Sequence, residues 1–188
     1  MILENCELTS PVGLLTLAVH EKRVVALSFG SLTARQCAYL ERRFPKFEKR
    51  RHKDPAGVAT RLRAYFDGDL DALAPIDVES WGTPFQQRVW AALRTIPAGQ
   101  TRSYGELAAE IGSPAAVRAV GAANGANPVG IIVPCHRVIG SNGTLTGFGG
   151  GLEAKRWLLD HEAAQLDLPR PWAPEAPQPL STLAGWIV

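Results

Sequence analysis

Residues 103–123 read SYGELAAEIGSPAAVRAVGAA, and this stretch carries the clearest structural signals in the 188-residue chain. Ser103 and Glu106 have the spacing of a capping box, in which each side chain bonds a free backbone N–H at a helix start. Gly112 ends that helix, and Ser113-Pro114 has the residue types that begin another. Two short helices joined by so tight a turn predict a helix-turn-helix.

Further elements are expected on both sides of this motif. Thr83-Pro84-Phe85-Gln86 is another capping signal and predicts a helix that reaches about Arg94. Apolar periodicity predicts more elements: strands over Ile2–Leu8, Leu14–His20 and Val24–Phe29, and helices over about 33–43, 56–66 and 152–162. The polar stretch that ends at Pro55 is expected to be a loop. This order of elements favours an α/β protein with its strands at the N-terminal end.

Composition limits the class of protein. Hydrophobic residues make up 46% of the chain, and no apolar run is long enough to span a bilayer. The N-terminus lacks a secretory pattern, so we expect a cytoplasmic protein. The three cysteines are scattered, which argues against a disulfide framework, and the four histidines lack ligand spacing. We therefore expect no metal and no cofactor, with Cys6 and Cys37 as packing residues.

A basic cluster lies between residues 42 and 53. Two interpretations are open, a solvated linker, which we favour, and a phosphate-binding patch. The net charge of +2 does not by itself indicate nucleic-acid binding. Its members are Arg42, Arg43, Lys46, Lys49, Arg50, Arg51 and Lys53.

The run Pro134-Cys135-His136-Arg137 has the residue types of a nucleophilic site. Proline restricts the backbone beside the cysteine, and a histidine can take the proton of a thiol that must react as thiolate. Adjacent side chains point in different directions, so His136 would act through a water. Glu162 is a candidate acceptor that orients the histidine. A chance Cys-His neighbourhood is the alternative.

The second helix of the motif, residues 115–123, consists of small residues around Arg118. Readout of base edges in the major groove needs several polar side chains, which this helix lacks. Small residues suit a close approach to the minor groove, with one cation probing the base stack. A buried helix packed by alanines, with Arg118 in a structural ion pair, explains the same pattern.

Several motifs in this order make the run from Gly82 to Glu162 resemble the O6-alkylguanine-DNA alkyltransferases, also called methylated-DNA–protein-cysteine methyltransferases. The matching motifs are Pro134–Val138, Arg118–Gly121, Asn127-Pro128, Lys155–Leu159 and His161-Glu162. The resemblance implies an N-terminal ribonuclease-H-like domain over 1–78, a small sheet with helices. It also implies a helical domain over 79–165 with a winged-helix-like helix-turn-helix and the active-site cysteine. The proline-rich C-terminal tail is longer than this family leads us to expect. Its prolines predict an irregular segment over 166–188, which Trp172 and Trp186 are expected to pin to the body.

The same resemblance implies roles for single residues. Cys135 would accept the alkyl group, His136 and Glu162 would relay its proton, and Asn127 would hold the active-site turn. Tyr104 would bond the guanine ring and help to rotate the nucleotide out, and Arg118 would fill the vacated space. The remaining expected site residues are Ala116, Val117, Ala119 and Gly121 on the DNA, and Pro134, Val138, Phe148 and Gly149 around the base.

The function implied is direct, single-turnover repair of O6-alkylguanine in double-stranded DNA, with O4-alkylthymine an open second substrate. The protein would act as a monomer, and clustering on DNA stays open. Three other functions compete with this one. A damage binder without a nucleophile conflicts with Cys135, a cysteine hydrolase leaves the helix-turn-helix unexplained, and a transcription regulator would need a more polar recognition helix.

Overall fold

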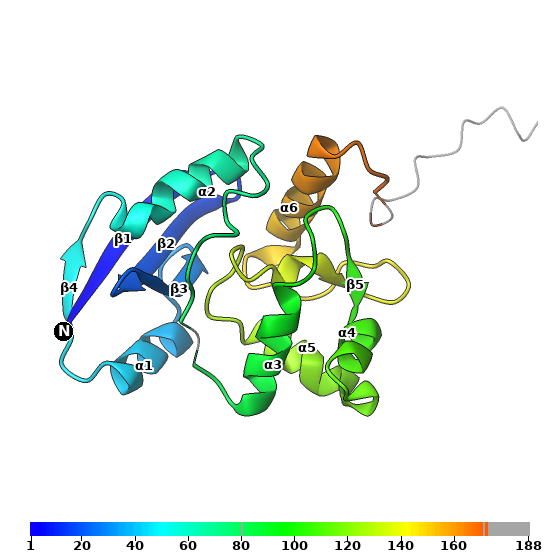
Figure 1. Cartoon of the computed structure of the whole chain (residues 1–188), viewed down its shortest axis with the longest axis horizontal. Helices are drawn as coiled ribbons and strands as arrows, with labels where there is room; N and C mark the ends of the chain where they lie inside the picture. The colour runs from blue at the N-terminus through cyan, green and yellow to red at the C-terminus, as the bar shows by residue number, and fades with distance from the viewer. Residues whose placement is uncertain (80, 171, 173–188) are drawn as a thin grey trace, which may run out of the picture.

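The computed structural model describes residues 1–79, 81–170 and 172 and shows a strand-rich first half beside a helical second half (Figure 1). A four-stranded sheet has the order β3-β2-β1-β4. β1 (Ile2–Ser10), β2 (Gly13–His20) and β3 (Arg23–Phe29) form an antiparallel meander, as the sequence predicts.

The fourth strand, β4 (Glu48–Arg51), corrects one prediction. The stretch before Pro55 was expected to be a loop, but part of it pairs in parallel with β1, Ile2 opposite Glu48. All four side chains are exposed, so no apolar pattern marks the strand. Its pairing rests on backbone hydrogen bonds, and its charged side chains suit an outer edge of the sheet. The linker interpretation of the basic cluster is therefore wrong for these residues.

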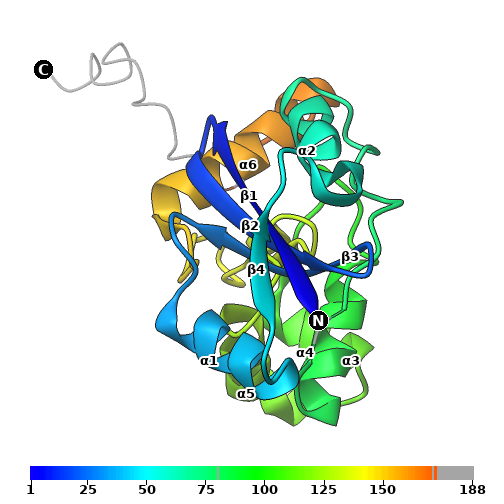
Figure 2. The ribbon, with the colours of Figure 1, turned by 90° about the vertical axis from the view of Figure 1, so that its left-hand side faces the viewer.

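Alternate strand residues point to opposite sides of the sheet, so the sheet has two faces. Both faces carry buried apolar side chains, and a helix covers each. α1 (Ala34–Arg43) packs with Ala18 and Val25 on one face. α2 (Val58–Phe66), which follows the short turn η1 (Pro55–Gly57), packs with Leu15 and Leu17 on the other. Figure 2 shows the two helices separated by the strands.

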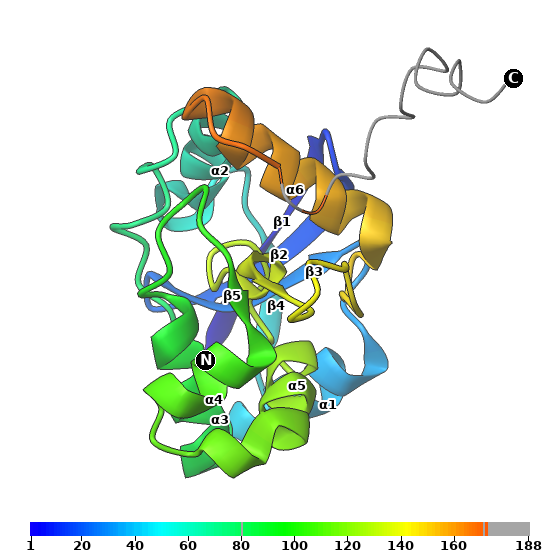
Figure 3. The same ribbon diagram turned by 90° about the vertical axis from the view of Figure 1, so that its right-hand side faces the viewer.

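The second half contains the expected helix-turn-helix. Its elements are α3 (Pro84–Leu93), β5 (Arg102–Ser103), α4 (Tyr104–Glu110), η2 (Pro114–Ala116), α5 (Val117–Gly125), η3 (Cys135–Arg137), β6 (Val138–Ile139) and α6 (Gly151–Gln165). Both capping boxes form as predicted, at Thr83 with Gln86 and at Ser103 with Glu106. α4 and α5 lie side by side (Figure 3), and the short strands β5 and β6 pair in parallel.

The two halves share one hydrophobic core and a backbone connection. The edge of β3 pairs with the segment that leads to the cysteine, because Leu27 N–H donates to the Pro128 carbonyl at 2.9 Å. Gly130 N–H donates back to the Leu27 carbonyl at 3.3 Å. The segment before Cys135 is therefore held against the N-terminal sheet.

The start of the tail is anchored. Trp172 is buried against α6, and its indole N–H donates to Asp160 at 2.9 Å. The other expected anchor, Trp186, lies outside the described residues. Within the described part of the chain, no helix has the length and apolar character needed to cross a membrane.

Candidate active site

Cys135 is the first residue of the single turn η3, after a buried and strained run. Ile131 has a φ of 67°, an unfavourable conformation for a β-branched side chain. Backbone bonds hold it: Ile132 N–H donates to Gly130 and Val133 N–H to Val129, at 2.8 and 3.0 Å. Strain of this kind persists only where the surrounding structure imposes it.

The Cys135 side chain is buried at the wall of a cavity of about 630 Å³. Burial raises the pKa of the thiol above its ordinary value of 9.0, because the thiolate loses its hydration. A hydrogen bond from Asn127 and the charge of Lys155 lower the pKa and partly offset that effect. The thiol is therefore mainly protonated at neutral pH and needs a base.

His136 and Glu162 form a fully buried pair, with 2.9 Å between His136 Nε2 and a carboxylate oxygen. Burial lowers the pKa of His136 below 6.5, although the carboxylate opposes this. The ring is therefore neutral at pH 7. When Nε2 donates its hydrogen to Glu162, Nδ1 becomes the proton acceptor. Nδ1 is buried and has no hydrogen-bond partner among the described residues.

Glu162 collects donors from both halves of the molecule. Arg137 donates through Nε at 3.0 Å and through Nη2 at 2.8 Å. Tyr65 of α2 donates its hydroxyl at 2.8 Å, and the Gly99 backbone N–H donates at 3.0 Å. Burial opposes ionisation, but His136 and Arg137 outweigh it and hold the pKa of the carboxyl far below 4.5. Sequence reasoning missed Tyr65 and Gly99, because neither belongs to a motif.

Two asparagines hold the backbone around the cysteine. Asn127 Nδ2 donates to the Val133 carbonyl at 2.8 Å, and its Oδ1 accepts Val129 N–H at 3.0 Å. Asn124 Nδ2 donates to the carbonyl of Cys135 itself at 3.3 Å. The structure thus places Asn127 against the active-site turn, and it adds Asn124, which the sequence analysis did not single out.

Lys155 is a further residue that the sequence analysis left without a role. Its side chain is fully buried, and its ammonium donates to the carbonyls of Val138 at 2.6 Å and Thr146 at 2.9 Å. Burial lowers its pKa to about 8, while the charge of ionised Cys135 opposes this. The sequence held no clear signal for this role, because the burial of Lys155 is visible only in the structure.

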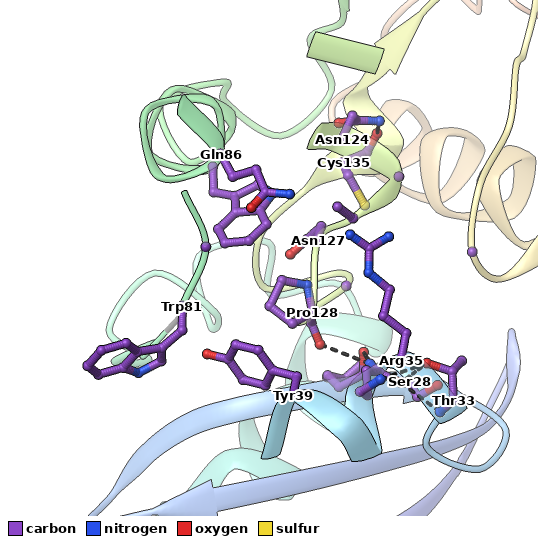
Figure 4. Close-up of a pocket in the computed structure, with 18 of the residues that line it drawn as sticks. Ser28, Thr33, Arg35, Tyr39, Trp81, Gln86, Asn124, Asn127, Pro128 and Cys135 are labelled. Atoms are coloured by element: carbon purple, nitrogen blue, oxygen red, sulfur yellow. Dashed lines mark hydrogen bonds between the residues drawn. The ribbon is translucent and has the colours of Figure 1, made fainter. Parts of the chain in front are cut away.

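The cavity lies between the two halves of the molecule (Figure 4). Phe148 and Gly149 line it together with Cys135, and the Phe148 ring packs edge-on against Phe29 of β3. Pro134 and Val138 are buried but do not line it. α1 supplies much of the opposite wall, and Arg35 points from that helix toward Cys135 (Figure 4).

The outer face of α5 is exposed. Val117, Arg118 and Ala119 face solvent, whereas Ala116 and Gly121 are half-buried. Arg118 makes no ion pair with any residue that the structure describes, so the buried-helix interpretation is wrong.

Tyr104 begins α4 behind this face. Its hydroxyl accepts a hydrogen bond from Thr146 at 3.1 Å. A methyl group at Gly121 would lie 3.8 Å from the Tyr104 ring, so the two helices approach closely here. In the described ranges, histidine, cysteine and carboxylate side chains form no cluster of three that could hold a metal ion.

Both halves of the chain match models of a known protein family. Residues 8–79 match the ribonuclease-like domain of 6-O-methylguanine DNA methyltransferase, and residues 84–164 match its DNA binding domain. A methylated-DNA–protein-cysteine methyltransferase of Shigella flexneri is 45% identical over 159 residues, which cover 83% of this chain and 93% of the relative.

Solved structures are similar as well. A crystal structure of Mycobacterium tuberculosis OGT in complex with DNA has a TM-score of 0.73 at 44% identity and covers 89% of this chain and 96% of that one. The M. tuberculosis O6-methylguanine methyltransferase reaches 0.74 at 42% identity, with coverage of 96% and 99%. The chain therefore belongs to the 6-O-methylguanine DNA methyltransferase family.

Proposed function

We propose that this protein repairs DNA by transferring the methyl group of O6-methylguanine to the sulfur of its own Cys135. The observation that carries this proposal is a buried thiol in a cavity next to a neutral, carboxylate-bound histidine. A thiolate is a strong nucleophile, and the thioether that it forms is not cleaved by cellular thiols. Each molecule therefore reacts once.

The first step is removal of the thiol proton. His136 Nδ1 accepts it through one water molecule, since the side chains of adjacent residues diverge. Glu162 stabilises the imidazolium that results, and the donors around that carboxylate keep it ionised at neutral pH. The charge of Lys155 favours the thiolate.

The second step is the transfer itself. The thiolate attacks the methyl carbon in line with the C–O6 bond, so a C–S bond forms as the C–O bond breaks. The electron pair stays on guanine, which then takes up a proton. Donors that face the base lower the energy of this leaving group, and we propose that Tyr104 and the Gly149 backbone N–H supply them. Phe148 walls the ring.

Access to the base requires rotation of the nucleotide out of the duplex, which costs a few kcal/mol. The small residues of α5 let the helix approach the minor groove, and Arg118 enters the vacated space. Double-stranded DNA that carries O6-alkylguanine is therefore the proposed partner.

Intact-protein mass spectrometry tests the function. The reduced protein is incubated with duplex DNA that carries one O6-methylguanine, and we expect a gain of one methylene mass that maps to Cys135. Cys135→Ser is the control and should bind the same DNA without a mass change. A folded, reduced wild-type protein that binds the lesion but gains no mass would contradict the proposal and leave a damage-binding protein.

A further inference from the structure

Gln36 of α1 stands out because its buried carboxamide makes two kinds of bond. Its Oε1 accepts the Thr33 backbone N–H at 2.9 Å, which completes the capping box of α1. Its Nε2 points the other way and donates to two backbone carbonyls, Pro128 at 3.0 Å and Leu27 at 3.3 Å. One side chain of the N-terminal half thus forms a hydrogen bond with the backbone of Pro128, in the segment that leads to the active site.

The bond to Pro128 is not needed to satisfy that carbonyl. Leu27 N–H already donates to it at 2.9 Å. Burying a glutamine costs desolvation and side-chain entropy, and the cap of α1 uses only its Oε1. The Gln36 Nε2 donor therefore does more than satisfy the Pro128 carbonyl, which Leu27 N–H already satisfies.

The segment that contains Pro128 leads directly to Cys135. Asn127, next to Pro128, donates to the Val133 carbonyl at 2.8 Å, and Cys135 N–H donates to the same carbonyl at 2.8 Å. Burial raises the pKa of the Cys135 thiol, and the Asn127 side chain acts against that effect by lowering it. A small rotation at Pro128 would move Asn127 and thereby change both contacts.

We propose that Gln36 is a positioning residue through which the N-terminal half orients Asn127 and, through Asn127, the Cys135 thiol. The inference rests on the proposed function, since it takes Cys135 as the nucleophile. Gln36 also lines the cavity that contains Cys135, so it lies at the reacting site without being assigned contact with the base. The N-terminal half is then part of the active site as well as a packing partner.

The matched pair of variants is Gln36→Met and Thr33→Ala. Gln36→Met removes the donors to Pro128 and Leu27. Thr33→Ala keeps the Gln36 carboxamide and removes only the hydroxyl that accepts Gln36 N–H and donates to Gln36 Oε1. Gln36→Glu is a third variant that keeps a cap acceptor and, when ionised, cannot donate. Two readouts are measured: the single-turnover methyl-transfer rate, and the pH dependence of Cys135 alkylation by iodoacetamide, mapped by peptide mass.

We expect Gln36→Met and Gln36→Glu to slow transfer about fivefold to tenfold, the effect of one lost hydrogen bond at the site, and to shift thiol ionisation to higher pH. Thr33→Ala should leave both readouts at wild-type values. If the Gln36 variants match Thr33→Ala in rate and pH profile and lose only thermal stability, Gln36 is a structural residue and the inference is wrong.

A double-mutant cycle tests the route through Asn127. In an Asn127→Ala background, Gln36→Met should cause no further shift of the iodoacetamide pH profile. An undiminished shift would show that Gln36 acts by another route, against the inference. This readout needs no methylated DNA, so it distinguishes failure of the inference from failure of the proposed methyl transfer.

Discussion

Glu162 carries its charge in the core, and that charge determines how the protein responds to acid. Its folded pKa is depressed, so its stabilising effect is present above about pH 4.5 and is lost as the pH falls toward the folded value. Glu162→Gln leaves Arg137 without its counter-charge, and we expect a loss of about 3 kcal/mol in the free energy of unfolding at neutral pH. Urea unfolding between about pH 3 and pH 7 measures the free energy of unfolding of both proteins. As the pH falls, the free energy of unfolding should decrease less for Glu162→Gln than for the wild type.

Glu153→Gln is the control for this measurement, because Glu153 is an exposed carboxylate on the same helix. Its unfolding curve should follow the wild type at every pH. An acid response of Glu162→Gln that equals the wild type would show that other carboxyls govern acid unfolding.

Lys155 is expected to control the reactivity of the thiol. Its charge lowers the pKa of Cys135, and its own pKa of about 8 means that this support is present below pH 8 and fades above it. Lys155→Met should therefore move the pH profile of Cys135 alkylation upward and slow methyl transfer most at pH 7. Arg156→Met, an exposed neighbour on α6, is the control. An unshifted profile in a folded Lys155→Met variant would leave Lys155 with a structural role only.

At the scale of elements, α5 presents one exposed cation on a surface of small residues. Arg118→Ala should leave thermal stability unchanged, because the described structure gives this side chain no ion pair. Methyl transfer from duplex DNA should slow by roughly tenfold to a hundredfold, since no arginine side chain then fills the space that the rotated nucleotide leaves in the duplex. The free base O6-methylguanine needs no flipping and should react at the wild-type rate.

Arg63→Ala on α2, an exposed arginine on another element, is the control for the loss of charge. Equal slowing by both variants, or equal slowing of Arg118→Ala on duplex and free base, would argue against a role of Arg118 in flipping.

The sequence predicted helices and strands correctly where the residues that mark them are close together in the chain, and it missed the strand β4, which depends on a distant partner. The capping boxes at Ser103 and Thr83 depend on residues three positions apart, and both helices begin where predicted. β4 depends on pairing with a strand more than forty residues earlier, and its all-charged sequence resembles a loop. Backbone pairing requires no particular side chain, so nothing in Glu48–Arg51 announced it.

At the scale of the whole molecule, Trp172 fastens the start of the tail to the helix that carries Glu162. The indole packs with Ile139, Leu159 and Ala163. Trp172→Ala should lower the free energy of unfolding by about 3 kcal/mol through lost burial, and Trp172→Phe by less. Thermal and urea unfolding check this, with Trp172→Phe as the control for the ring. Unchanged stability of Trp172→Ala would mean that the tail is not anchored in solution.

The sequence by itself determined the helix-turn-helix, the Cys135-His136 motif and the small-residue composition of the second helix, because each depends on residues within a few positions of one another. It also suggested Glu162 as the partner of His136. That the second helix is exposed was decided by the tertiary structure. Only the tertiary structure decided which distant groups complete the site. Tyr65 lies 97 positions from Glu162, and Gln36 lies 92 positions from Pro128. Such contacts arise when the two halves pack around one core, and a periodic pattern or short motif carries no record of that packing.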